Sequence, residues 1–146
     1  VIGVREGCVM AARWAQRDWS FPSVGRMKQG QDVKALIYIS PEKQIKGLGI
    51  DSTLSDRNLL QLPTLILAGA NSPEADEAER IAKRIEAMKK RMGKGRATGF
   101  SLKMPGTNLS GPSLVNDVSP VIPAIVNFVK SEVRISQDEN PWVDRD

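Results

Sequence analysis

The chain has 146 residues, of which 40% are hydrophobic and 26% are charged, and its formal net charge is +4. This length can bury the core of one domain, the composition is typical of a globular protein, and the mild positive charge does not by itself indicate a nucleic-acid partner. The sequence contains no histidine and one cysteine, which excludes a Ser-His-Asp triad, a histidine metal ligand and an intrachain disulfide within this chain.

The N-terminal residues predict a strand, a sharp turn and a helix. Residues 1–4 are mostly apolar and predict the end of a buried strand, and apolar residues then recur at helical spacing over residues 7–19. Cys8 has no histidine partner and falls on this helix, so we interpret it as a core residue. Residues 33–39 are apolar apart from one lysine and predict a second strand, buried on both faces.

The middle of the chain predicts a long connection and a third strand. Residues 42–62 show little periodicity, and a short helix over residues 56–61 would be capped by Ser55. Residues 65–68 are a short apolar run between a proline and a glycine, which is typical of a buried strand. We therefore expect little regular structure between the second and third strands.

A long helix follows the third strand. Ser72 and Pro73 match a helix start, with a capping hydroxyl and then proline at the first helical position. The helix is expected to run to about Met92 and to end at Gly93. Its basic end, residues 89–96, is interpreted as a solvated face that complements the helix dipole, because no aromatic platform lies nearby to stack on nucleic-acid bases.

The last part of the chain predicts an edge strand and a final helix. Residues 100–104 alternate apolar and polar, which indicates a half-exposed strand. Residues 105–112 predict a loop, and Ser119 with Pro120 begins the last helix. The residues expected on the inner side of that helix are Val121, Ile122, Ile125, Val126 and Val129.

Strands and helices thus alternate four times, which predicts an α/β fold. We expect a three-layer α-β-α arrangement in which helices cover both faces of a mostly parallel sheet. Residues 1–135 would form one α/β domain, and the polar residues 136–146 would form a C-terminal tail.

The first turn carries the pattern Gly3-x-Arg5-x-Gly7 between a strand and a helix. It resembles the nucleophile elbow Gly-x-Ser-x-Gly of the α/β-hydrolases, with Arg5 in the place of the serine. Three later segments resemble, in the family's order, its next strand, the strand before its acid loop and the loop that delivers its histidine: residues 33–41, 63–69 and 104–109. The resemblance covers about residues 1–133 and implies the C-terminal half of that fold, strands 5–8 with their helices.

The resemblance also implies that all three positions of the family's triad are degenerate. Arg5 occupies the nucleophile position, Asn71 or Ser72 that of the acid, and Leu109 or a neighbour that of the histidine. A guanidinium stays protonated and cannot act as a nucleophile. Losing one member of such a triad already leaves only about 10³–10⁴-fold acceleration over water. Ordinary serine-hydrolase chemistry is therefore not expected from this chain.

The carboxyl ends of the strands are the expected binding crevice, because ligands bind there in open α/β sheets. The resemblance to the α/β-hydrolases implies that six residues face this crevice and are the candidate ligand-binding residues: Arg5, Glu6, Asn71, Ser72, Asn108 and Leu109. Arg5 and the free N–H groups of the following helix could hold a carboxylate or phosphate, whereas a local ion pair is the plainer interpretation. Glu74 or Asp76 could replace the missing acid, although the plainer role of both is as acids in the first helical turn, with Ser72 as the cap.

Three hypotheses about function remain open. The first is a divergent, non-catalytic α/β-hydrolase-like protein that acts as a binding or interaction module, with an anion site at the former elbow. The second is an esterase-like hydrolase whose missing groups lie in an N-terminal half absent from this chain. The third is a Rossmann-like nucleotide binder, which is disfavoured because Gly3-x-x-x-Gly7 lacks the three-glycine spacing.

The sequence predicts partners only in outline. No cofactor, metal or nucleic acid is indicated, and no apolar run approaches the roughly 18 residues of a membrane span. Nothing in the residues assigns a cellular compartment. If an N-terminal half is missing, the strand at residues 1–4 has an unpaired side and exposed apolar faces. We therefore expect association with another copy or with that N-terminal segment.

Overall fold

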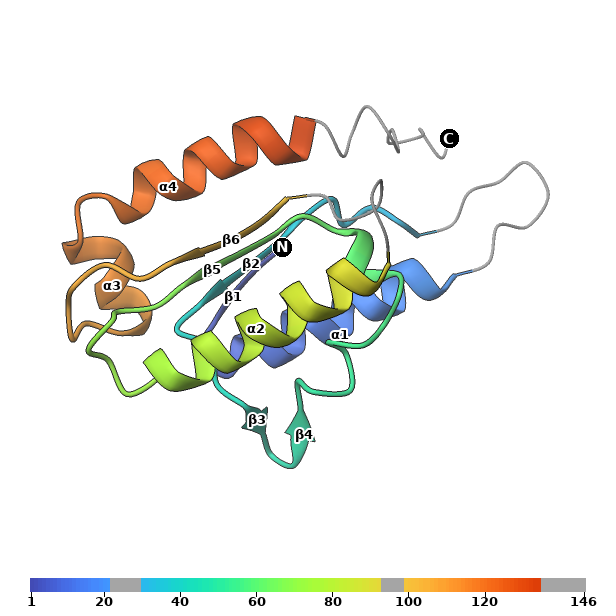
Figure 1. The fold of residues 1–146 in the computed structure, drawn as a ribbon, viewed down its shortest axis with the longest axis horizontal. Helices are drawn as coiled ribbons and strands as arrows, with labels where there is room; N and C mark the ends of the chain where they lie inside the picture. The colour runs from blue at the N-terminus through green and yellow to red at the C-terminus, as the bar shows by residue number, and fades with distance from the viewer. Residues whose placement is uncertain (22–29, 93–98, 135–146) are drawn as a thin grey trace.

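A computed structural model describes residues 1–21, 30–92 and 99–134. In chain order its elements are β1 (Ile2–Val4), α1 (Gly7–Ser20), β2 (Leu36–Ile39), β3 (Gln44–Ile45), β4 (Leu48–Gly49), the 3₁₀ helix η1 (Leu59–Gln61), β5 (Thr64–Leu67), α2 (Ala75–Arg91), β6 (Phe100–Lys103), α3 (Gly111–Asp117), α4 (Val121–Phe128) and the π-helical turn η2 (Val129–Val133). Figure 1 shows α1 and α2 on one side of the sheet and α4 on the other.

The main sheet has four strands in the order β1-β2-β5-β6, and all three strand pairs are parallel. Gly3 pairs with Tyr38, and Tyr38 in turn pairs with Ile66. The expected α/β class and the mostly parallel sheet are therefore confirmed. β1 and β6 are the two edges, so the prediction of an edge strand at residues 100–104 is also confirmed.

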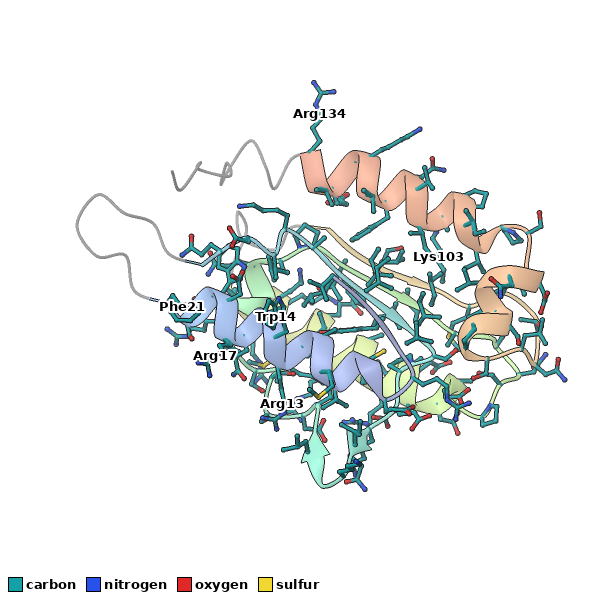
Figure 2. The ribbon with its side chains drawn as sticks, turned by 180° about the vertical axis from the view of Figure 1, so that it is seen from behind. Arg13, Trp14, Arg17, Phe21, Lys103 and Arg134 are labelled. Atoms are coloured by element: carbon teal, nitrogen blue, oxygen red, sulfur yellow. The ribbon has the colours of Figure 1, made fainter. Side chains whose placement is uncertain are left out.

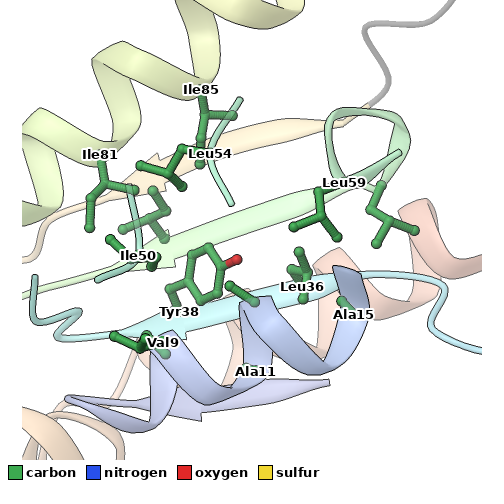
Figure 3. Close-up of a cluster of buried hydrophobic side chains, with 14 of the residues drawn as sticks. Val9, Ala11, Ala15, Leu36, Tyr38, Ile50, Leu54, Leu59, Ile81 and Ile85 are labelled. Carbon is green, nitrogen blue, oxygen red and sulfur yellow. The ribbon is translucent and has the colours of Figure 1, made fainter. Parts of the chain in front are cut away.

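Each central strand contributes side chains to two separate cores because alternate residues point to opposite faces. Leu36, Tyr38 and Ile66 pack with residues of α1, α2 and η1, and Figure 3 shows this cluster. Ile37 and Leu65 belong to the second core, together with residues of α3 and α4. The continuous apolar run at residues 33–39 is thus explained by burial on both faces.

The first strand is more exposed than expected. Ile2 is 54% exposed, because β1 lies at the edge of the sheet and, among the described residues, no strand lies beyond it. The adjacent helix α1 matches its expected range to within one residue. Cys8 on this helix is fully buried, which confirms that it is a core residue.

The connection between β2 and β5 holds more structure than expected. β3 and β4 pair as a small antiparallel hairpin, and the short helix is a 3₁₀ turn that begins at Leu59. Ser55 is not its cap. Instead, the backbone N–H groups of Asn58 and Leu59 donate to Asp56 Oδ1 at 2.8 and 3.4 Å. Asp56 stabilises this turn because its carboxylate accepts hydrogen bonds from the free N–H groups that follow it in the chain.

The start of α2 also differs from the prediction. The helix begins at Ala75 with Glu74 at the N-cap position, and no side chain caps it. Ser72 lies before it, in a turn closed by a hydrogen bond from the Ala75 N–H to the Ser72 carbonyl oxygen. At the other end, Lys89 is only 3% exposed, so the prediction of a solvated basic end is wrong at this residue.

The C-terminal part has two helices instead of one. Residues 111–117 form α3 in place of the expected end of a loop. In α4 the buried residues are Val121 and Phe128, whereas three residues expected on the inner side are exposed: Ile122, Val126 and Val129. This helix is apolar on nearly all sides, so its periodicity could not decide which face packs on the sheet.

The predicted helix end at Gly93, residues 93–96 of the predicted basic end and the predicted tail 136–146 lie outside the described residues. Within the described part of the chain, no helix combines the length and the apolar character needed to cross a membrane.

Candidate functional site

The turn between β1 and α1 places Arg5 at the carboxyl end of the sheet. Its φ of 52° lies in the left-handed region, which is uncommon for a residue other than glycine. The Arg5 N–H donates to the Ile39 carbonyl oxygen at 2.9 Å, and the Arg5 carbonyl oxygen accepts from the Cys8 N–H at 3.0 Å. The strand therefore passes directly into the helix, with the Arg5 side chain at the bend.

Gly3 lets the strand and the helix cross closely. A Cβ at this position would lie 2.6 Å from Cys8 Cα and 2.7 Å from the Gly7 carbonyl oxygen. Both contacts are with backbone atoms, which cannot rotate away. Gly7 is different, because a Cβ there would meet nothing within 4 Å. Of the two glycines in the turn motif, only Gly3 lies where a side chain would be sterically excluded.

Three carboxylates surround the Arg5 guanidinium. Arg5 Nε donates to Glu42 Oε1 at 2.8 Å, Arg5 Nη2 lies 3.6 Å from Glu74 Oε1, and Arg5 Nε lies 4.0 Å from Glu6 Oε2. The hydrogen bond and charge of Glu42, followed by the charge of Glu74, raise the pKa of Arg5. The plainer interpretation of Arg5 as a partner in local ion pairs thus describes the contacts that it makes.

The loops that follow the other strands close on the same point. The Gly111 N–H donates to Ser40 Oγ at 2.8 Å, and a Cβ on Gly111 would lie 3.1 Å from Arg5 Cδ. A Cβ on Gly69 would lie 2.6 Å from the carbonyl oxygen of Leu109 and 3.3 Å from Ser72 Cβ. We call this junction of the loops after β1, β2, β5 and β6 the mouth.

The predicted site residues differ in how they reach the mouth. Arg5, Ser72 and Leu109 lie in the contacts just described. Asn71 joins the loops through its backbone, because its N–H donates to the Thr107 carbonyl oxygen at 3.0 Å, while the residue itself is exposed. Glu6 and Asn108 are also exposed, on the β1–α1 turn and the β6–α3 loop. Whether these six residues bind a ligand stays a prediction.

Two carboxylates of the mouth were not among the six predicted residues. Glu42 follows β2, and Glu74 is only 7% exposed. Glu74 is one of the two possible replacement acids, and it lies beside Arg5, with 3.6 Å between Arg5 Nη2 and Glu74 Oε1. Asp76, the other candidate, is exposed on α2. A signal for Glu42 existed in its position directly after a buried strand, at the edge where the carboxyl ends of parallel strands meet.

Unsatisfied polar atoms gather in the segments that form the mouth. Among the described residues, four buried side-chain atoms have no hydrogen-bond partner, and three of them are Ser72 Oγ, Glu74 Oε2 and Ser110 Oγ. Buried polar atoms are normally paired. This is therefore the part of the described structure in which polar groups are least well satisfied.

Replacing Ser72 with alanine tests the corrected helix start. A capping serine contributes about 1 kcal/mol, which its alanine variant would lose. Since Ser72 Oγ is buried without a partner and caps nothing, we expect the free energy of unfolding of Ser72→Ala to stay within about 0.5 kcal/mol of the parent or to rise. Urea denaturation measures the difference. A loss of about 1 kcal/mol or more would show that Ser72 does cap the helix.

The buried thiol has no catalytic character. Cys8 Sγ donates to the Ile39 carbonyl oxygen at 3.7 Å, and burial raises the pKa of this thiol to about 12. The thiolate, which is the nucleophilic form, is therefore scarce at neutral pH. Among the described residues, no group of three or more Cys, Asp or Glu side chains is arranged to hold a metal ion.

Comparisons with models of known protein families, with curated proteins and with solved structures find no match to this chain.

Proposed function

We propose that this chain is a divergent α/β-hydrolase-like module that acts by binding and has lost hydrolase chemistry. The observation that carries the proposal is Arg5, which stands at a sharp strand-to-helix turn with a φ of 52°. In the α/β-hydrolases a strained turn of this kind presents the nucleophile at the top of the sheet. The contact distances at Gly3 support the comparison, because the strand and helix could not cross so closely around a side chain.

The chemistry at the mouth supports loss of catalysis. Arg5 is hydrogen-bonded to Glu42 at 2.8 Å and stays protonated. The chain has no histidine to act as general base, and the two loops that would supply the other triad members contribute Ser72 and Leu109. What remains at the mouth is a set of charged and hydrogen-bonding groups at the edge of the sheet where α/β proteins commonly bind ligands.

The proposed ligand class is a small anion or carboxylate, and it must compete with the groups already on Arg5. Glu6, Glu42 and Glu74 all have a carboxylate oxygen within 4.0 Å of the guanidinium, so one cation faces three anions. An added anion would be repelled unless it displaced Glu42. In this proposal, the Arg5–Glu42 ion pair therefore limits the affinity of the mouth for anions.

The loss of catalysis is tested with activated esters. We expect the parent chain and Arg5→Ser to hydrolyse them no faster than buffer does, because a serine at the bend would still lack a base. Each protein is purified under the same conditions and assayed alongside a denatured sample. Turnover by the parent chain that disappears in Arg5→Gln would contradict the proposal and would assign a catalytic role to this mouth.

The anion is tested by titrating phosphate and acetate while recording the backbone amide NMR signals of residues 5–8. We expect small shifts in the parent chain and larger, saturable shifts in Glu42→Gln, which frees the guanidinium. Arg5→Gln should abolish the shifts. Arg84→Gln is the matched control, because Arg84 is also exposed and ion-paired, at 3.4 Å from Asp51, but lies on α2. If the anions caused equal NMR shifts in Glu42→Gln and in the double variant Glu42→Gln/Arg5→Gln, Arg5 would not be part of the binding site.

A further inference from the structure

Among the described residues, no strand pairs with the outer edge of β1. On its inner side, the Ile37 N–H donates to the Val1 carbonyl oxygen at 3.0 Å and the Arg5 N–H donates to the Ile39 carbonyl oxygen at 2.9 Å. Since backbone groups alternate along a strand, those of Ile2 and Val4 face away from β2. Natural edges usually carry lysine, proline or a bulge that prevents further pairing, and β1 has none of these.

Apolar side chains flank this edge on both faces of the sheet. On one face, α1 exposes Met10 and Trp14, and Trp14 is 64% exposed. On the other face, α4 and η2 expose Ile122, Val126 and Val129, whose spacing of four and three residues places them along one side of the helix. Figure 2 looks onto β1 between these layers, with Trp14 on α1 below it and α4 above.

An apolar groove joins the edge to the two flanking helices. It has a volume of about 420 Å³, and Ile2, Trp14 and Val129 all line it. The strand edge, the α1 stripe and the α4 stripe are therefore parts of one continuous surface. We call it the β1 surface, and its large exposed side chains are Val1, Ile2, Met10, Trp14, Phe21, Ile122, Val126 and Val129.

We propose that the β1 surface is the interface of a two-fold symmetric dimer of this chain, independent of any ligand at the mouth. A two-fold axis through Gly3 pairs β1 antiparallel with β1 of a second copy, so that Ile2 of each copy exchanges backbone hydrogen bonds with Val4 of the other. Gly3 then lies at the non-hydrogen-bonded position, where the two backbones approach most closely. The two sheets become one continuous sheet.

A second copy covers more of this surface than a single added strand could. A strand from another protein would satisfy the edge and fill the groove, but it would not extend over Met10 and Ile122 on the helices. In a two-fold arrangement, each apolar stripe meets the same stripe of the partner copy. A standard interface buries roughly 800 Å² per partner, so a stable dimer needs the two apolar stripes as well as the strand edge.

Sedimentation equilibrium at concentrations up to roughly 100 µM tests the dimer. We expect the parent chain to be dimeric, and Ile2→Lys and Trp14→Glu each to weaken association by at least about tenfold. Both residues are more than half exposed, so the variants should fold, and circular dichroism verifies this. Leu48→Glu is the matched control, because Leu48 is 44% exposed on the β3–β4 hairpin and lies outside the β1 surface.

The dimer proposal fails if the parent chain is monomeric throughout this range, or if Leu48→Glu dissociates it as strongly as Trp14→Glu does. Amide hydrogen exchange tests strand pairing in folded protein without any substitution. The N–H groups of Ile2 and Val4 should exchange more slowly as the concentration rises. Those of Phe100 and Leu102 on β6, the opposite edge of the sheet, should not change. Protection on β6 in place of β1 would overturn the proposal.

Discussion

Replacing Gly3 with alanine is expected to destabilise the fold by about 3 kcal/mol, at the upper end of the usual cost of overpacking. The new Cβ would lie 2.6 Å from Cys8 Cα and 2.7 Å from the Gly7 carbonyl oxygen. Neither atom belongs to a flexible side chain, so relief requires β1 or α1 to move. Because Cys8 and the neighbouring Val9 are fully buried, such a movement disturbs the core beneath α1.

Gly7→Ala is the matched control for this prediction. Gly7 is the first residue of α1, and a Cβ there meets nothing within 4 Å. Alanine should therefore be neutral or should stabilise the helix, by up to about 1 kcal/mol. Urea denaturation at neutral pH measures both variants, and for Gly3→Ala the thermal midpoint should fall by about 10 °C. If Gly3→Ala were as stable as Gly7→Ala, the close crossing of strand and helix would be wrong.

The contribution of Lys89 to the stability of the protein is expected to rise between pH 8 and pH 10.5. This residue is 3% exposed, and its Nζ donates to the Leu62 carbonyl oxygen at 2.8 Å. Burial lowers the pKa of its ammonium group from 10.5 to about 8, and the charge of Glu132 opposes this shift in part. The folded chain therefore loses this proton at lower pH than the unfolded chain does.

The direction of the effect follows from proton linkage. Below pH 8 both states carry the charge, so folding bears the whole cost of burying it. Between pH 8 and 10.5 the folded lysine is neutral while the unfolded lysine is still charged, so the contribution of Lys89 to the free energy of unfolding increases with pH. Cys8 acts in the opposite direction above about pH 9, because burial raises the pKa of its thiol to about 12. The total contribution is about 3 kcal/mol, at about 1.4 kcal/mol per pKa unit.

Comparison with Lys89→Met isolates this contribution from the other groups that titrate. Urea denaturation measures the free energy of unfolding of both proteins at several pH values from 7 to 10. The value of the parent minus that of Lys89→Met should increase as the pH rises. The Leu62 carbonyl oxygen also accepts from Thr64 Oγ1, at 3.2 Å, so this acceptor should stay paired when Lys89 is replaced. Lys90→Met is the control, because Lys90 is exposed on the same helix. A flat difference for Lys89→Met, or an equal slope for Lys90→Met, would show that Lys89 is not buried as a charge.

Local patterns predicted the elements that depend on local contacts. The helix over residues 7–20 was predicted to within one residue because its apolar side recurs at helical spacing. The strand at residues 36–39 was predicted because a short apolar run suits burial on both faces. For α4 the same reasoning was right for Val121 and Ile125, which pack on the second core, and wrong for Ile122, Val126 and Val129, which are exposed. Apolar residues surround this helix, so its pattern could not separate the two groups.

The mouth was predictable in place but not in composition. The carboxyl ends of parallel strands share one edge of a sheet, and the resemblance to the α/β-hydrolases implied that Arg5, Ser72 and Leu109 lie at that edge. The contact between Arg5 and Glu42 spans 37 positions of sequence, and no periodicity links two such distant residues. The buried carboxylate of Glu74 was similarly hidden, because an acid in that position also suits the first turn of an exposed helix.

The sequence by itself determined the alternation of strands and helices, the glycine-flanked turn and, through the absence of histidine, the exclusion of a histidine-based triad. Only the tertiary structure decided that β1 is an edge strand of the described sheet, that Arg5 is near carboxylates from three segments and that Lys89 is buried. The physical reason is that helices and strands follow from contacts within a few residues. Burial and ion pairing depend instead on which distant segments pack together.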